Sequence, residues 1–142
     1  MDFAYSQRTR DLQARLGLTY LLISHDLAVV AYMSQRVGVL YLGEFMEIAD
    51  TREIVKDPRH PYTRALMAAV DARSGSADAA TVAGEIPSPM NPPSGCTFHP
   101  RCPHAQKRCQ TEKPALREVR PFHLVACHFA ESLPERAAAP RA

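Results

Sequence analysis

The chain has 142 residues, of which 46% are hydrophobic and 23% charged, and its formal net charge is +2. This length allows one ordinary domain or a partial domain with a small appendage, and the composition excludes wholesale disorder. The small net charge gives no indication of a nucleic-acid partner or an acidic substrate. No apolar stretch approaches the roughly 20 residues that span a bilayer, and the first residues lack a signal-peptide core. We therefore expect a cytosolic or peripheral protein.

The N-terminal quarter predicts a helix followed by a buried strand. Leu12 and Leu16 lie four residues apart, and Gly17 is placed as a C-terminal cap, so residues 3–16 are expected to be helical. The next segment, LTYLLIS at 18–24, is a continuous apolar run. Such a run is typical of a parallel strand that is covered on both faces. We therefore expect an α/β fold.

A second helix and a hairpin are predicted next. Asp26 is suited to cap a helix that continues to about Ser34. Residues 36–42 and 44–49 are two strand-like runs on either side of Gly43, which is the pattern of a hairpin.

Two further helices are expected after the hairpin. Asp50 and Glu53 have the spacing of a capping box ahead of a short helix that ends near Asp57. Pro61 suits the first turn of a longer helix, whose apolar residues recur at a spacing of four through Val70.

Composition divides the chain into four parts. Residues 1–71 carry the predicted helices and strands, and 72–93 form a linker of small, polar and proline residues. Residues 94–130 form a cysteine-rich, loop-rich extension, and 131–142 are expected to be a disordered tail.

All four cysteines lie in the extension, and residues 1–95 have none. In a reducing cytosol, clustered thiols favour a metal over disulfides. Four thiolates suit an iron–sulfur cluster or a structural zinc, and unmetallated thiols or disulfides remain a third possibility. The spacing lacks the CxxC pairs of most zinc sites, although nearby histidines could complete a zinc site of mixed ligands. The cysteines are Cys96, Cys102, Cys109 and Cys127, and the histidines are His99, His104, His123 and His128.

His25 follows the predicted buried strand directly. In open α/β sheets, ligands collect beyond the carboxyl ends of the strands, so a histidine there can donate to a phosphate oxygen or orient a water. The alternative is a histidine that only caps a turn. Position alone does not separate these two interpretations.

The order of motifs resembles one family. LTYLLISHDLAVVAYMSQRVGVLYLGEFMEIA resembles the end of the nucleotide-binding domain of ABC transporters, where an apolar strand leads into a Ser-His-Asp switch loop. DPRHPYTRALMAAV, GEIPSPMNPPSGCTFHPRCPHAQKRC and LVACH resemble the C-terminal extension of dipeptide and oligopeptide importer ATPase subunits. The resemblance covers roughly residues 10–130, and the ordered set of motifs is specific.

The resemblance implies a role for His25. In the family, the matching histidine contacts the γ-phosphate of ATP and positions the attacking water, which suits a reaction catalysed mainly by positioning and charge stabilisation. Ser24 and Asp26 would hold the loop and start the next helix. The segment from Asp57 to Thr63, including His60, is expected to have only a structural role.

The resemblance also implies cofactors and partners. The four cysteines match those that hold a four-iron four-sulfur cluster in some members, and ATP with magnesium binds the parent subunit. Expected partners are a second ATPase subunit, the membrane permease subunits and a peptide-binding protein, with no nucleic acid. The chain would then lie peripherally on the cytoplasmic face of the membrane.

The sequence also departs from the family. It contains no GxxxxGK[ST] loop, and the Walker B and signature motifs are missing. We therefore expect the C-terminal part of a longer ATPase subunit that does not hydrolyse ATP by itself, and whose strand at 18–24 has exposed apolar faces. The alternative is a free-standing metal-binding accessory module that docks on an intact subunit.

Overall fold

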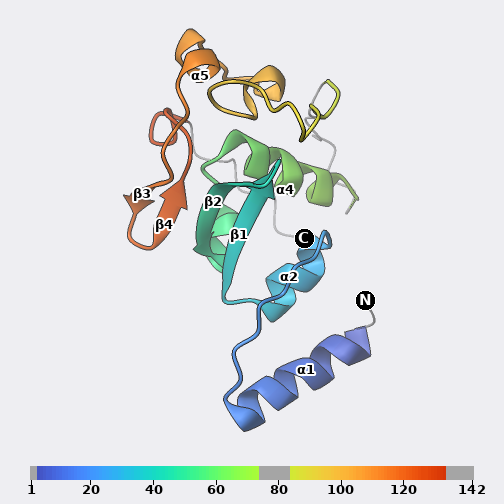
Figure 1. Cartoon of the computed structure of the whole chain (residues 1–142). Helices are drawn as coiled ribbons and strands as arrows, with labels where there is room; N and C mark the ends of the chain where they lie inside the picture. Colours follow the sequence, from blue (N-terminus) through green and yellow to red (C-terminus); the bar gives the residue numbers. More distant parts are fainter. Residues whose placement is uncertain (1–2, 74–83, 134–142) are drawn as a thin grey trace.

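The computed structural model of the chain describes residues 3–73 and 84–133, and Figure 1 shows the arrangement of their helices and strands. A small sheet lies at the centre, helices lie beside it, and α1 projects away from the rest of the molecule. The elements are α1 (Phe3–Leu16), α2 (Leu27–Met33), β1 (Arg36–Tyr41), β2 (Glu44–Asp50), α3 (Thr51–Lys56), α4 (Pro61–Arg73), the 3-10 helix η1 (His99–Arg101), α5 (Lys107–Thr111), β3 (Arg117–Arg120) and β4 (His123–Val125).

The sheet is antiparallel, with the strand order β1-β2-β4-β3. β1 and β2 form the predicted hairpin, whose turn places Leu42 and Gly43 at positive φ angles of 49° and 82°. The second half of the sheet comes from the cysteine-rich segment, because β4 pairs with β2 through Glu47 and Val125. The hairpin and the extension therefore share one sheet.

The core on one side of the hairpin joins the sheet to α3 and α4. β1 alternates exposed and buried residues, so that Val37 and Val39 face inward beside Ala49 of β2. Ile54 of α3 and Met67 of α4 complete this cluster. This alternation has the period of a half-buried strand.

A second core lies between the end of the hairpin and the cysteine-rich segment. Tyr41 and Met46 pack with Phe98, and Tyr62 of α4 joins them from the side. The Tyr41 and Phe98 rings meet edge to face, with 5.3 Å between their centroids. Cys96 and Cys109 belong to the same cluster. The extension therefore packs directly on the hairpin.

The predicted strand at 18–24 is wrong, because this segment has no regular structure. Leu21 is 92% exposed and Ile23 is 89% exposed. A continuous apolar strand needs neighbours on both sides and cover on both faces, and the described residues supply no strand that pairs with it. The expected exposure of its apolar side chains is confirmed.

The other predictions for 3–73 agree with the structure, which confirms the mixed α/β class. The helices at 3–16, 27–33, 51–56 and 61–73 and the hairpin form as expected. One detail differs, because Asp50 makes no side-chain hydrogen bond as the cap of α3. Part of the predicted linker, at 74–83, and most of the predicted tail, at 134–142, lie outside the described residues.

Within the part of the chain that the structure describes, none of the helices has the length and apolar character needed to cross a membrane.

Candidate metal centre

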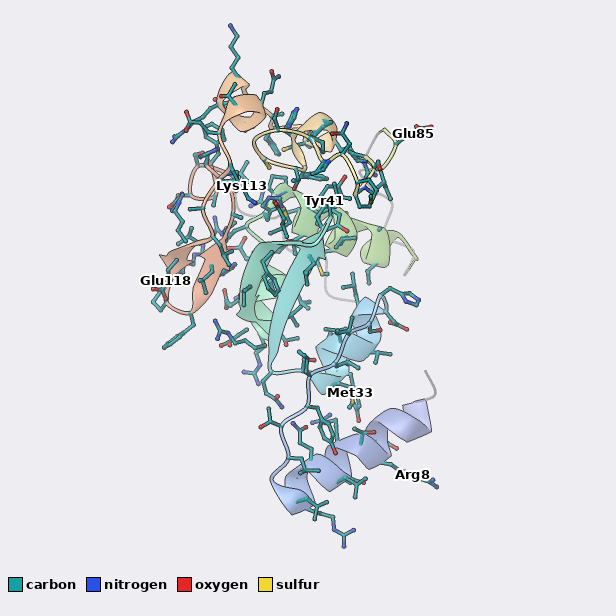
Figure 2. The ribbon with its side chains drawn as sticks, in the orientation of Figure 1. Arg8, Met33, Tyr41, Glu85, Lys113 and Glu118 are labelled. Carbon is teal, nitrogen blue, oxygen red and sulfur yellow. The ribbon has the colours of Figure 1, made fainter. Side chains whose placement is uncertain are left out.

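The four cysteines line one small hollow, whose cavity volume is about 20 Å³. They reach it from four places in the fold: the loop before η1, the residue after η1, the middle of α5 and the segment after β4. Tyr41, which is labelled in Figure 2, lies at the end of β1 nearest to this region. The structure therefore brings together the four residues that the sequence singled out, which are Cys96, Cys102, Cys109 and Cys127.

A close backbone approach holds the first and third cysteines beside each other. The Cys96 N–H donates to the Cys109 carbonyl at 2.8 Å. Gly95 has a φ angle of +68°, and a Cβ atom there would lie 2.4 Å from the Cys109 oxygen. Only glycine fits this position without displacing the backbone. The Ser94 hydroxyl adds a hydrogen bond to the Gln110 carbonyl at 2.8 Å.

Short local turns place the second and fourth cysteines. The Cys102 N–H donates to the His99 carbonyl at 3.2 Å, which closes η1. Cys127 follows Ala126, whose N–H donates to the Met46 carbonyl at 2.9 Å and so extends the pairing of β4 with β2. The fourth cysteine is thereby fixed to the sheet, although it lies 18 residues after Cys109 in the sequence.

Backbone N–H groups point at three of the cysteine sulfurs from two residues further along the chain. The Phe129 N–H lies 3.4 Å from the Cys127 sulfur. Equivalent backbone donors, at Phe98 and His104, act on the sulfurs of Cys96 and Cys102. A neutral thiol is a weak acceptor, whereas a thiolate or metal-bound sulfur is stabilised by such donors.

Burial makes the thiols costly to ionise. Burial raises the pKa of Cys96 and Cys127, and it raises the pKa of Cys102 to about 11. The other cysteines raise these pKa values further, because several thiolates would repel one another around one hollow. A cation that bridges the sulfurs would remove that repulsion.

The side chains do not converge on a single point. In the described ranges, 3–73 and 84–133, no group of three or more His, Cys, Asp or Glu side chains is arranged to hold one metal ion. The cysteines line one hollow, and they come from four separate places along the chain. A polynuclear group has separate metal atoms for separate sulfurs, so it needs less convergence than a mononuclear site does.

The four histidines considered as zinc ligands are not equivalent. His99, His104 and His128 line the hollow, whereas His123 lies in the sheet against Glu47. His99 is bonded through Nδ1 to the Cys96 carbonyl at 2.9 Å, and His128 through Nε2 to the Glu112 carbonyl at 3.1 Å. His104, by contrast, is exposed.

His60 also lines the hollow, which sequence reasoning missed. It is 1% exposed and its ring packs near Phe98, with 5.9 Å between the centroids. Burial lowers its pKa to about 4, although Glu47 acts to raise it, so the ring is neutral near pH 7. The prolines on either side of His60 indicated only the start of a helix. The cysteines lie more than 30 residues away in the sequence, so no local spacing links them to His60.

A buried carboxylate joins the extension to the rest of the fold. Glu47 is fully buried and accepts the N–H groups of Arg59 and His60 at 2.7 and 2.9 Å. Its Oε1 also lies 2.6 Å from Nε2 of His123 on β4. One side chain thus ties β2 to the start of α4 and to the strand that precedes Cys127. The sequence alone gives no signal for this contact, because a glutamate in a strand is ordinarily predicted to face solvent.

Near the cysteines, Arg108 pairs with Glu112 at 2.7 Å, and both side chains are more than half exposed, so this ion pair lies at the surface. Arg117 was not predicted as part of the site. Its guanidinium binds Glu131, lies 3.4 Å from the Cys127 carbonyl and acts to lower the Cys127 pKa.

His25 lies apart from the cysteines and does not line their hollow. It is exposed in a bend between the apolar segment and α2. The Asp26 carboxylate accepts the N–H groups of Ala28 and Val29 at 3.0 and 3.2 Å, and the Ser24 hydroxyl accepts the Asp26 N–H at 3.0 Å. The loop around His25 is therefore held by its neighbours, as expected, while the imidazole is open to solvent.

Comparison with known proteins finds one matching family model and several relatives of one kind. Residues 46–109 match the family model described as "Oligopeptide/dipeptide transporter, C-terminal region". The chain corresponds to the C-terminal part of an ATP-binding subunit of a peptide ABC transporter. The recognition made from the switch loop and the extension motifs is thereby confirmed.

Three relatives illustrate the match to peptide ABC transporters. A peptide import ATP-binding protein of Brucella ovis is 58% identical over 122 residues, which cover 83% of this chain and 38% of the relative. The oligopeptide transport ATP-binding protein AppF of Bacillus subtilis is 48% identical over 123 residues, covering 84% and 37%. A peptide ABC transporter ATP-binding protein of Sinorhizobium fredii is 47% identical over 120 residues, covering 83% and 34%. The chain thus spans less than two fifths of these relatives.

Proposed function

We propose that the chain supplies the switch histidine and a metal-binding extension to an ATP-hydrolysing subunit that energises the import of dipeptides or oligopeptides. The observation that carries this proposal is the 58% identity to a peptide import ATP-binding protein across the switch loop, the hairpin and the extension together. The permease, a second ATPase subunit and a peptide-binding protein would be its partners. Its place would be peripheral, at the cytoplasmic face of the membrane.

His25 is proposed as the catalytic residue of the assembled subunit. Its loop is fixed by Ser24 and the Asp26 cap, while the imidazole is exposed and free to meet a ligand from another part of the subunit. ATP with magnesium would be bound mainly by the missing phosphate loop, and His25 would contact the γ-phosphate and orient the water. Because the chain carries no such loop, the isolated chain is proposed to be inactive as an ATPase.

The extension is proposed to hold one four-iron four-sulfur cluster on Cys96, Cys102, Cys109 and Cys127. The shared hollow, the backbone donors directed at the sulfurs and the thiol pKa values raised by burial and mutual repulsion all suit a group that neutralises several thiolates. When bound, the cluster would cross-link four points of the extension, which is a structural role.

Zinc is the competing occupant. It would need four ligands converging within about 2.3 Å of one point, and the described side chains form no such group. The cysteines would have to move together, or one of the rim histidines would have to leave its carbonyl partner.

A chimera tests the function. The C-terminal part of Bacillus subtilis AppF that matches this chain can be replaced by residues of this chain, since the two are 48% identical. We expect the chimera to restore uptake of an AppF-dependent peptide in a strain that lacks AppF. The same chimera with His25→Ala should assemble but lose uptake, and Leu21→Ala is the matched control in the same loop region. No uptake by a stably expressed parent chimera would contradict the proposal.

The second candidate is a metal-binding accessory module that docks on an intact subunit. The exposed side chains of Leu21 and Ile23 favour this second candidate, because an exposed apolar segment often marks a binding site for another protein. This candidate predicts that the chain binds full-length AppF without replacing any part of it. Magnesium-dependent ATP hydrolysis by the pure 142-residue chain would contradict both candidates.

A further inference from the structure

A second and larger hollow, the groove, lies beside the sheet where β4 ends. Its volume is about 290 Å³, close to the lower end of the roughly 300–1,000 Å³ that is usual for small-molecule pockets. One wall comes from the first residues of β2, at 44–46, and the other comes from the segment 113–116, which leads into β3. Ala126, which directly follows β4, also lines the groove. The groove therefore lies in line with β4, between the continuations of its two neighbours.

The short length of β4 explains the groove. β4 has three residues and lies between β2, which has seven, and β3, which has four. The Ala126 N–H still donates to the Met46 carbonyl at 2.9 Å, but Cys127 lines the cysteine hollow and not the groove. Because neighbouring strands lie about 4.8 Å apart, the two walls are separated by about the width of one strand. A narrow, elongated ligand fits such a space.

The interior of the groove is mostly apolar but holds one unpaired hydroxyl. Met46 and Pro114 are buried, and Leu116 is half-buried. Thr97 also lines the groove and is 4% exposed, and its hydroxyl has no hydrogen-bond partner among the residues that the structure describes. Because an unpaired buried hydroxyl is costly, this group favours a ligand that brings a hydrogen-bond acceptor into the groove.

Two opposite charges stand at the edge of the groove, one on each wall. Oε1 of Glu44 lies 2.5 Å from Nζ of Lys113, which is labelled in Figure 2. The two side chains are 31% and 66% exposed, and an ion pair at the surface contributes little to stability, so separating the two groups costs little. A carboxylate and an ammonium beside an apolar groove complement a ligand that has both charges and an apolar side chain.

We propose that the groove binds a dipeptide with large apolar side chains. Glu44 pairs with the ammonium of the dipeptide, and Lys113 pairs with its carboxylate. The Thr97 hydroxyl donates to its peptide carbonyl, and an apolar side chain fills the space between Met46 and Leu116. A dipeptide is a product that the proposed importer would deliver to the cytoplasm, so the source of the ligand rests on the proposed function.

Calorimetric titration of the pure 142-residue chain with leucyl-leucine tests the site. We expect saturable binding of one dipeptide per chain. N-acetyl-leucyl-leucine amide lacks both charges and should bind at least tenfold more weakly. Free leucine has both charges but no peptide carbonyl, and it should also bind at least tenfold more weakly.

Substitutions then place the ligand. Thr97→Val removes the hydroxyl and keeps the shape of the side chain, so it should weaken binding about tenfold without loss of stability in urea denaturation. Glu44→Gln and Lys113→Gln should each weaken binding about tenfold as well. Glu112→Gln is the matched control, because Glu112 forms a surface ion pair with Arg108 and does not line the groove. It should bind leucyl-leucine as the parent chain does.

The remaining outcomes separate this site from the proposed function. A folded parent chain that does not bind leucyl-leucine overturns the inference, while uptake by the chimera is unaffected. Equal binding of leucine and leucyl-leucine overturns the recognition of a peptide. Binding that none of the three groove substitutions weakens places the dipeptide elsewhere and also overturns the inference. Binding in the groove together with a chimera that fails in uptake supports the site and contradicts only the proposed function.

Discussion

The N-terminal arm, residues 3–25, and the hairpin, residues 36–50, are both rich in apolar side chains, but these side chains differ in solvent exposure. In the arm, Leu21 and Ile23 are almost fully exposed, whereas Val39 and Ala49 of the hairpin are buried. The hairpin finds its pairing partner within a few residues and its cover in α3, α4 and the extension. The arm depends on neighbours that the described residues do not provide. An apolar run therefore becomes a strand only where its partners are present.

The largest effect should come from breaking the joint between the hairpin and the extension. Glu47→Ala removes the acceptor for Arg59, His60 and His123 and leaves buried donors unpaired. We expect the free energy of unfolding to fall by about 3–5 kcal/mol in urea denaturation. Glu44→Ala is the matched control on the same strand, because its pair with Lys113 is at the surface and should cost about 1 kcal/mol or less. Equal losses for the two variants would contradict the buried joint.

Acid should weaken the packed region through His60. Its pKa in the folded, metal-free chain is lowered to about 4, so the unfolded chain takes up a proton near pH 6.5 while the folded chain does not. The stability due to the neutral ring is therefore present above about pH 6.5 and is lost as the pH falls toward 4, by about 3 kcal/mol at most. Urea denaturation at several pH values should show a flatter profile for His60→Gln.

His25 provides the control for that pH profile, since it is an exposed histidine in the arm. His25→Gln should leave the pH dependence of unfolding as in the parent chain. If both variants have the pH profile of the parent chain, the burial of His60 does not determine the pH dependence of unfolding.

Gly95 tests the close approach of the first and third cysteines. Gly95→Ala would place a Cβ atom 2.4 Å from the Cys109 carbonyl oxygen, in addition to the cost of a positive φ. Gly17→Ala has a similar φ of +64° but meets no atom within 4 Å, so it isolates the backbone cost of about 1–2 kcal/mol. We expect Gly95→Ala to lose more unfolding free energy than Gly17→Ala and to reduce metal content. Equal losses, with full metal content, would show that the approach is dispensable.

The smallest change in stability should come from the arm. The double change Leu21→Ser and Ile23→Ser alters two exposed side chains, so unfolding free energy should change by less than about 0.5 kcal/mol per site. Self-association should fall, because the exposed apolar segment is removed. Sedimentation velocity checks this, and a large loss of stability with unchanged association would mean that the segment is packed.

Local patterns predicted local structure well. The two strand-like runs on either side of Gly43 and the Asp26 cap each act within a few residues, and each forms as expected. The strand at 18–24 failed because a continuous apolar run specifies burial without supplying its neighbours. Glu47 and His60 were missed because their roles depend on contacts with residues far along the chain, for which spacing in one sequence gives no signal.

The four cysteines lie between these two cases. Their clustering in the sequence predicted one site, and the structure places them around one hollow. The sequence could not reveal that β4 fixes the segment before Cys127 to the hairpin, since that pairing joins residues about 80 positions apart.

The most direct test is the analysis of iron, acid-labile sulfide and zinc in the anaerobically purified chain, together with its absorption spectrum. The account predicts about four iron and four sulfide per chain with a broad brown absorbance, and loss of both when Cys127→Ser removes the ligand fixed to the sheet. One zinc without sulfide, or no metal at all, would contradict the central claim that the four cysteines hold an iron–sulfur cluster.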